Sequence, residues 1–266
     1  MTKTEKPPAD FLETMRKRVD RAWEIEQDNI KNAYDDLDFA AGNQWPAELR
    51  ATREKENRPC LTINQVLTFC RQITGDMRQS RPAIKVYGVD DKADKKTAET
   101  FNEVIRYIEN RSDAKEVYFR GIDTQVLAGI GHIRLVTERR APGSDEQEIR
   151  ILPVDDGVSV LWDPDAVLPG KSDASWCFVP VDYEYDTLKD RYPDADISGF
   201  STLEEMTRNY ADVSAYWSAS DKVRIGEYFV VDPGKKGETP VVNRYVVSER
   251  EVLEGPDVVP GGRIPV

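Results

Sequence analysis

Apolar residues recur every three or four positions along the first half of the chain, a spacing typical of amphipathic helices. Such stripes predict long helices over residues 10–41, 90–111 and 113–128. A shorter helix is expected over residues 47–56, where charges of both signs alternate. Gly42-Asn43 follows the first stripe, and we expect this pair to end the first helix.

The stretch Asn57–Gly88 predicts a turn, a helix, a second turn and a strand, and we expect it to be a packing centre. Thr62 and Gln65 have the spacing of a capping box at the start of the helix. Arg81-Pro82 is expected to end the helix, because the residue before a proline is pushed out of helical geometry. Residues 83–87 alternate as a strand does. The apolar stripe that we expect to lie in the core consists of Ile63, Val66, Leu67, Cys70, Ile73 and Met77.

Several single residues carry their own expectations. Trp45 is interpreted as an aromatic anchor in the core. Asp113 and Glu116 have the spacing of a helix-capping pair. Gly121 is expected to permit a close helix contact. Gly129 is interpreted as the glycine that ends a helix, rather than as part of a nucleotide-binding G-x-G loop, because it follows a helix and precedes a strand.

From residue 131 the pattern changes to alternation with a period of two, which is typical of strands. Two short helices are expected between the strands, one over 184–191 and one from Ser201 to Asn209. The sequence therefore predicts an α+β fold in which long N-terminal helices pack with a mixed, mostly antiparallel β-rich region. The candidate strands are 131–138, 148–153, 157–162, 175–181, 223–232 and 240–248.

The domain organisation follows from this change of pattern. We expect residues 1–9 to be a flexible arm, because they are polar and contain Pro7-Pro8. A helical region over 10–130 and a β-rich region over 131–253 follow. Residues 254–266 are expected to be a loop, and they read as a chain that stops before the rest of a larger protein.

Charge divides the chain of 266 residues unevenly. Residues 1–140 contain 25 basic and 24 acidic side chains, whereas residues 141–266 contain 12 basic and 25 acidic ones, which gives a net charge of −12. Such an acidic surface argues against tight binding to nucleic acid, because cations that meet phosphates supply most of that affinity. The sequence contains neither a signal peptide nor an apolar stretch of membrane-spanning length, which favours a cytoplasmic protein without membrane contact.

Residue types that often carry chemistry are few. Cys60, Cys70 and Cys177 have no metal-ligand spacing, and we interpret them as small hydrophobic residues in a reducing compartment. His132, the only histidine, lies between isoleucines at a strand start and is interpreted as structural. The sequence also lacks the phosphate-binding loop of an ATP-driven motor. We expect no catalytic, cofactor-binding or metal-binding residues.

Four aspartates form the best alternative to that expectation. Asp155, Asp156, Asp163 and Asp165 lie close together in the sequence, and paired carboxylates can hold Mg²⁺ in a nuclease. However, Asp163-Pro-Asp165 is also an ordinary turn after a strand, and we favour the turn.

Several short elements occur in an order that resembles a known family. They are the stretch Asn57–Gly88, the segment Gly129–Leu135, the run Ile151–Asp155, the turn Trp162–Ala166 and the segment Trp176–Val179. Together with the helix that ends at Arg191-Tyr-Pro, they resemble the N-terminal part of the portal proteins of P22-like tailed phages and prophages. The resemblance covers roughly residues 30–230.

The resemblance implies a structural, non-enzymatic subunit of a dodecameric ring at one capsid vertex. Double-stranded DNA passes through such a ring without sequence-specific binding, and terminase, capsid and scaffolding proteins and tail adaptors are its partners. The ring would be assembled in the host cytoplasm and become part of the virion. Long helices of mixed charge suit the lateral contacts of such a ring. A generic virion adaptor or scaffold domain remains an alternative, and a metal-dependent nuclease that uses the Asp155–Asp165 cluster is a less favoured one.

Overall fold

The computed structural model describes residues 10–80, 84–88, 95–141, 143–195, 218–219, 222–234, 239–248 and 250–266. The chain forms two compact units: unit 1 combines Met1–Ile30 with Ser159–Pro265, and unit 2 comprises Lys31–Val158 together with Val266. Helix α1 (Phe11–Ala41) contributes residues to both units. Helices occur with antiparallel sheets, so the predicted α+β fold is confirmed.

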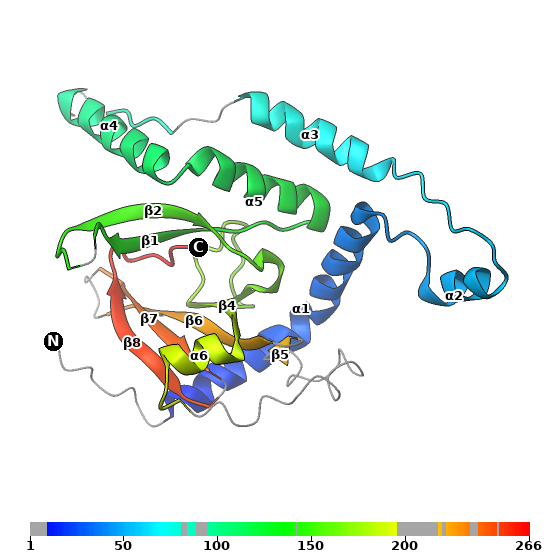
Figure 1. The fold of residues 1–266 in the computed structure, drawn as a ribbon. Coiled ribbons are helices and arrows are strands. Elements are labelled where there is room, and N and C mark those ends of the chain that lie inside the picture. The colour runs from blue at the N-terminus through cyan, green and yellow to red at the C-terminus, as the bar shows by residue number, and fades with distance from the viewer. Residues whose placement is uncertain are drawn as a thin grey trace. The chain divides into compact units, whose positions relative to one another are not determined.

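Unit 1 is built on an antiparallel sheet with the order β3-β4-β6-β7-β8, in which β5 also pairs with β6 (Figure 1). The strands are β3 (Leu161–Trp162), β4 (Trp176–Glu184), β5 (Ser218–Ala219), β6 (Lys222–Asp232), β7 (Val241–Val247) and β8 (Val252–Val259). The short helix α6 (Tyr185–Arg191) follows β4 and packs on the sheet through the fully buried Leu188.

The first half of α1 packs against this sheet. Met15, Val19 and Ala22 repeat at helical spacing and are fully buried. The ring of Phe11 contacts that of Tyr228 edge to face at 5.9 Å, and the Arg18 guanidinium donates a hydrogen bond of 3.0 Å to the Tyr228 hydroxyl. The apolar stripe predicted for this helix therefore corresponds to its buried face.

Strand β8 corrects the first part of the expectation that residues 254–266 form a loop, because residues 254–259 belong to this strand and only 260–266 lie outside it. Gly255-Pro256 reads as a turn in the sequence, yet it lies inside a paired strand. The strand tolerates this pair because it is at the sheet edge, and its register with β7 shifts between Arg244 and Val246.

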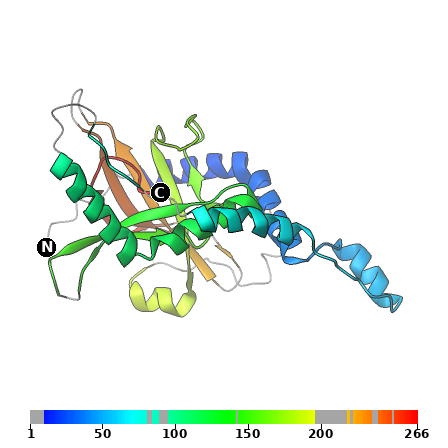
Figure 2. The same ribbon diagram turned by 90° about the horizontal axis from the view of Figure 1, so that it is seen from above.

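Unit 2 consists of helices around a hairpin. Its elements are the end of α1, α2 (Ala47–Lys55), α3 (Val66–Ser80), α4 (Lys95–Arg111), α5 (Ala114–Ala128), β1 (Ile133–Arg139), β2 (Gln147–Pro153) and a 3₁₀ turn, η1 (Gly157–Ser159). β1 and β2 pair antiparallel, and α4 and α5 pack against them. In Figures 1 and 2, α3 runs along α5, whereas α2 lies apart from the other helices of the unit.

The core of unit 2 lies between α5 and the hairpin. Ala114, Val117 and Ile151 are buried together, and Ile133 packs against them. The Ser112 hydroxyl accepts a buried hydrogen bond of 2.9 Å from the backbone N–H of Ile151, which joins the α4–α5 corner to β2.

Two predicted strands differ from the structure. Residues 157–162 form η1 and then the two-residue β3, rather than one strand. Residues 84–87 are the described part of the strand predicted over 83–87, and they pair with none of the described strands. Instead, both backbone groups of Val86 bond to the Asn102 side chain of α4, at 2.8 and 3.1 Å.

The predicted helix caps also differ. The Asn64 side chain, rather than Thr62 with Gln65, accepts the backbone N–H of Leu67 at 3.3 Å and caps α3. Asp113 adopts φ 48° and makes no side-chain bond to α5. Gly129 does end α5, with φ 81°. Gly121 does permit a close approach, but its neighbours are His132 and Ile133 rather than a helix.

Some expectations lie outside the described residues or stay open. The arm over 1–9, the Arg81-Pro82 stop and the helix from Ser201 to Asn209 fall on residues that are not described, although α3 does end at Ser80. The division into regions 10–130 and 131–253 stays a prediction about domains. Within the described residues, no helix is both long and apolar enough to cross a lipid bilayer.

Candidate interaction surface

The apolar stripe that was predicted to lie in the core, most of which belongs to α3, does not do so. Leu67 and Cys70 are only partly buried, and the other members are exposed: Ile63, Val66, Ile73 and Met77. Phe69, Ile73 and Met77 are 64%, 56% and 41% exposed. The neighbouring face of the helix, which includes the buried Thr74, packs towards α5 instead. The apolar part of α3 is therefore wider than the surface that α5 covers, and part of it faces solvent in the isolated chain.

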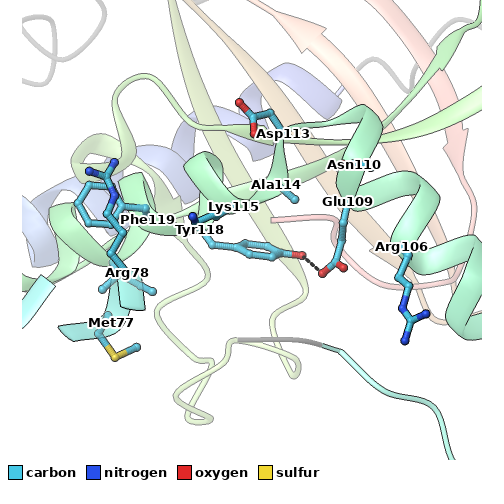
Figure 3. A pocket seen from close by; sticks show the side chains of 11 residues that line it. Met77, Arg78, Arg106, Glu109, Asn110, Asp113, Ala114, Lys115, Tyr118 and Phe119 are labelled. Atoms are coloured by element: carbon cyan, nitrogen blue, oxygen red, sulfur yellow. Dashed lines mark hydrogen bonds between the residues drawn. The ribbon is translucent and has the colours of Figure 1, made fainter. Parts of the chain in front are cut away.

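A groove lies where the end of α3 meets the corner between α4 and α5 (Figure 3). It encloses about 600 Å³. Its lining combines apolar and aromatic side chains with three cations and two carboxylates: Met77, Arg78, Arg106, Glu109, Asn110, Asp113, Ala114, Lys115, Tyr118, Phe119 and Ile122. We call it the α3–α5 groove.

Internal contacts hold the groove's aromatic residues in place. The Arg78 guanidinium lies 3.8 Å from the centre of the Phe119 ring and donates a hydrogen bond of 3.0 Å to Glu116. The Tyr118 hydroxyl donates to Glu109 at 3.3 Å, as Figure 3 shows. Partial burial and the Glu109 carboxylate raise the pKa of Tyr118, so this hydroxyl remains a donor at neutral pH. Arg106 and Lys115 at the rim are exposed.

The end of α1 carries a second surface of different character. Asp35, Asp36 and Asp38 are exposed there, and no basic residue occupies the last turn of the helix. Carboxylates at this end are unfavourable, because the helix dipole is negative there. The sequence already contains this signal, but our sequence analysis did not single out these aspartates. Of the groove residues it named Met77 only as a core residue and Asp113 only as a helix cap.

Two apolar side chains follow close to this acidic helix end. Leu61 and Ile63 are 77% and 83% exposed on an extended segment. Asn64 fixes that segment to the end of α1, because its amide donates a hydrogen bond of 2.6 Å to the carbonyl of Ala40. We call residues 35–41 and 61–63 together the acidic tip.

Between the two parts of the tip, α2 contributes little to packing, since it contains no buried residue. Trp45 is not the core anchor that we expected. It is only partly buried, its indole N–H donates to the carbonyl of Leu61 at 3.3 Å, and the Arg53 guanidinium lies 4.9 Å from its ring centre. Trp45 therefore joins the two ends of the segment that contains α2 to each other, and it also contacts α2 through Arg53.

The four aspartates of the alternative metal site have other partners. Asp163 accepts the backbone N–H groups of Asp165 and Ser175 at 3.1 Å each, which confirms the turn. Asp165 forms a two-point ion pair with Arg21, and this pairing lowers the pKa of the carboxyl. In unit 2, Asp156 accepts a hydrogen bond of 2.6 Å from the Tyr34 hydroxyl, and Asp155 lies 3.7 Å from Arg120. No three potential metal ligands gather among the residues described by the structure.

The histidine and the cysteines are buried or partly buried within the fold. His132 Nδ1 donates a hydrogen bond of 2.6 Å to the carbonyl of Gly157, and burial lowers the pKa of the ring. Cys177 is fully buried in β4, which raises the pKa of its thiol. Cys60 and Cys70 are partly buried free thiols.

Comparisons with known proteins agree with one another. Residues 16–266 match the profile of the family described as phage P22-like portal protein. The chain is also 27% identical over 241 residues to the portal protein of Acyrthosiphon pisum secondary endosymbiont phage 1. That match covers 87% of this chain and 32% of the relative, so the chain spans about a third of the relative's length.

Proposed function

The chain belongs to the phage P22-like portal protein family, and on that basis we propose that it is a structural subunit of the portal ring at a capsid vertex. The family match, which extends from residue 16 to residue 266, is the observation that carries this proposal. In the proposed role the subunit contributes shape and contact surfaces, and it catalyses no reaction.

The finer parts of the proposal concern assembly and partners. We propose that copies of the subunit close into a ring of twelve in the host cytoplasm, and that the ring then joins capsid and scaffolding proteins. Terminase docks on the ring during DNA packaging, and tail adaptors dock later. The exposed α3–α5 groove and the acidic tip support this role, because ring subunits need contact surfaces that the isolated chain leaves open.

The charge of the chain supports passage of DNA rather than its capture. A net charge of −12 opposes the phosphate backbone, and sequence-specific readout of DNA usually relies on basic and amide side chains. A wall that does not bind DNA permits the duplex to slide.

The test is to image the protein, produced from its complete gene, by negative-stain electron microscopy, and to weigh its assemblies by native mass spectrometry. We expect closed rings with a central hole, and a mass equal to that of twelve subunits. A protein that remains a folded monomer at micromolar concentration would contradict the proposal and favour an adaptor domain instead.

A further inference from the structure

We infer that the acidic tip of one subunit docks into the α3–α5 groove of the next subunit in the ring. This inference rests on the proposed function, because it names the contact that closes the ring. A ring of identical subunits needs two unlike surfaces that fit each other, since each subunit contacts one neighbour with one surface and the other neighbour with the second. Unit 2 contains two such surfaces.

The tip is acidic, whereas the groove lining carries three cations against two carboxylates. Asp35, Asp36 and Asp38 of the tip are exposed at a helix end that disfavours negative charge. Two cations that the groove exposes at its rim are Arg106 and Lys115. Cations brought close to the three carboxylates would remove the unfavourable interaction with the helix dipole, so the tip gains from a basic partner.

Both surfaces also contain apolar side chains that could pack against each other. Phe39, Leu61 and Ile63 of the tip are 45%, 77% and 83% exposed. The groove offers Met77 and the partly buried Tyr118 between its charged groups. Burial of large apolar side chains favours association, and the flanking charges fix the orientation of the contact.

A subunit cannot place its tip in its own groove. Asn64 fixes the tip beside the start of α3, whereas Met77 and Arg78 lie at the far end of the same helix. A helix rises 1.5 Å per residue, so α3 keeps the two surfaces roughly 20 Å apart. The tip that fills the groove must therefore come from a second copy of the chain.

Charge reversal tests the contact. A tip variant carries Asp35→Lys, Asp36→Lys and Asp38→Lys, and a groove variant carries Arg106→Glu and Lys115→Glu. Lysine is favoured near the end of α1 and glutamate at position 115 near the start of α5, whereas glutamate at position 106 lies near the end of α4, where the helix dipole disfavours it. Circular dichroism and thermal unfolding of each variant check that the fold is kept, so that loss of assembly reports the contact.

We expect each variant to lose rings in native mass spectrometry, with subunit dissociation constants raised at least tenfold. A single chain that carries both sets of changes should form rings again, because the charges remain opposite. An equimolar mixture of tip and groove variants should form rings in which the two variants alternate, because the lysine tip then meets the glutamate groove and the unaltered tip meets the unaltered groove. Rings in either single variant, or no recovery in the combined variant, would overturn the inference.

A control variant with Asp186→Lys, Asp190→Lys and Asp194→Lys changes the net charge by the same amount as the tip variant does, at exposed positions of unit 1. It should assemble like the unaltered protein, and loss of its rings would show a general effect of charge and overturn the inference. If the unaltered protein forms no ring, the proposed function fails. If it forms rings that survive both reversals, only the assigned contact fails.

Discussion

At Gly226 the sheet of unit 1 has no room for a side chain. A Cβ atom there would lie 1.9 Å from Cζ of Phe178, whose ring is fully buried and cannot move aside. Gly226→Ala should therefore lower the free energy of unfolding by about 1–3 kcal/mol, the usual effect of overpacking a core. Denaturant unfolding followed by tryptophan fluorescence measures the change.

Gly170→Ala is the matched control, because a Cβ atom at Gly170 has no neighbour within 4 Å. Its effect should remain within about 0.5 kcal/mol, as for most surface substitutions. Equal unfolding midpoints for the two variants would show that the space beside Phe178 adapts to a methyl group.

His132 should give unit 2 a pH-dependent stability. Burial lowers the pKa of the folded ring below the ordinary value, although the hydrogen bond to Gly157 opposes this. Between the lowered pKa and about 6.5 the unfolded chain binds a proton that the folded chain does not, so the free energy of unfolding falls as the pH drops through this window. Urea unfolding at several values from about pH 7 to pH 5 should show the fall.

Because the sequence contains one histidine, His132→Gln provides a direct comparison. The variant lacks the titrating ring, and its stability should change less over the same window than that of the unaltered protein. Identical pH profiles would mean that carboxylates alone cause any dependence.

At the scale of elements, Asn64 joins the end of α1 to the start of α3. Its amide donates to the carbonyl of Ala40 at 2.6 Å, and its oxygen accepts the N–H of Leu67 at 3.3 Å. Asn64→Ala should cost about 1–2 kcal/mol, the range for a lost helix cap, and hydrogen exchange at Leu67 should become faster.

Asn64→Asp separates the two contacts, because aspartate retains the acceptor but lacks the donor. Leu67 should then stay protected from exchange, while the last turn of α1 exchanges faster. Equal exchange at both places in the two variants would contradict this division of roles.

Helix α3 shows how far the sequence predicts structure. The spacing of Val66, Cys70, Ile73 and Met77 correctly indicates a helix with an apolar flank. It does not indicate what covers that flank, because burial depends on which surfaces the rest of the molecule brings near. We expected a core stripe, whereas α5 covers the adjacent face that includes Thr74. The candidate site was therefore predictable as a helix but not as a surface.

Strand β8 shows a different limit. Gly255-Pro256 carries a strong local turn signal, and a proline in a central strand would remove a ladder hydrogen bond. Only the sheet order shows that this strand lies at the edge, where the loss is tolerated. In contrast, β2, β6 and α6 agree closely with the predicted ranges, because their local patterns and their tertiary surroundings favour the same structure.

At the scale of the whole molecule, the acidic charge and the open surfaces of unit 2 have separate consequences. In the ring that we propose, the groove and the tip would meet between copies, and local pairs of opposite charge can form there although every copy has a net charge of −12. The net charge governs what happens over longer distances, up to about a Debye length, and therefore concerns DNA that passes nearby.

The protein should consequently bind duplex DNA very weakly. Association of a labelled 30-base-pair duplex, followed by fluorescence anisotropy at about 50 mM and 200 mM salt, should give no saturation below about 10⁻⁴ M protein, the weak end of non-specific affinity. Few cations meet phosphates, so the small signal should depend only slightly on salt, whereas a basic channel would show a steep loss between the two concentrations. Micromolar binding that disappears at high salt would mean that a concentrated basic surface outweighs the net charge, and a passive wall would then be the wrong description of how this subunit meets DNA.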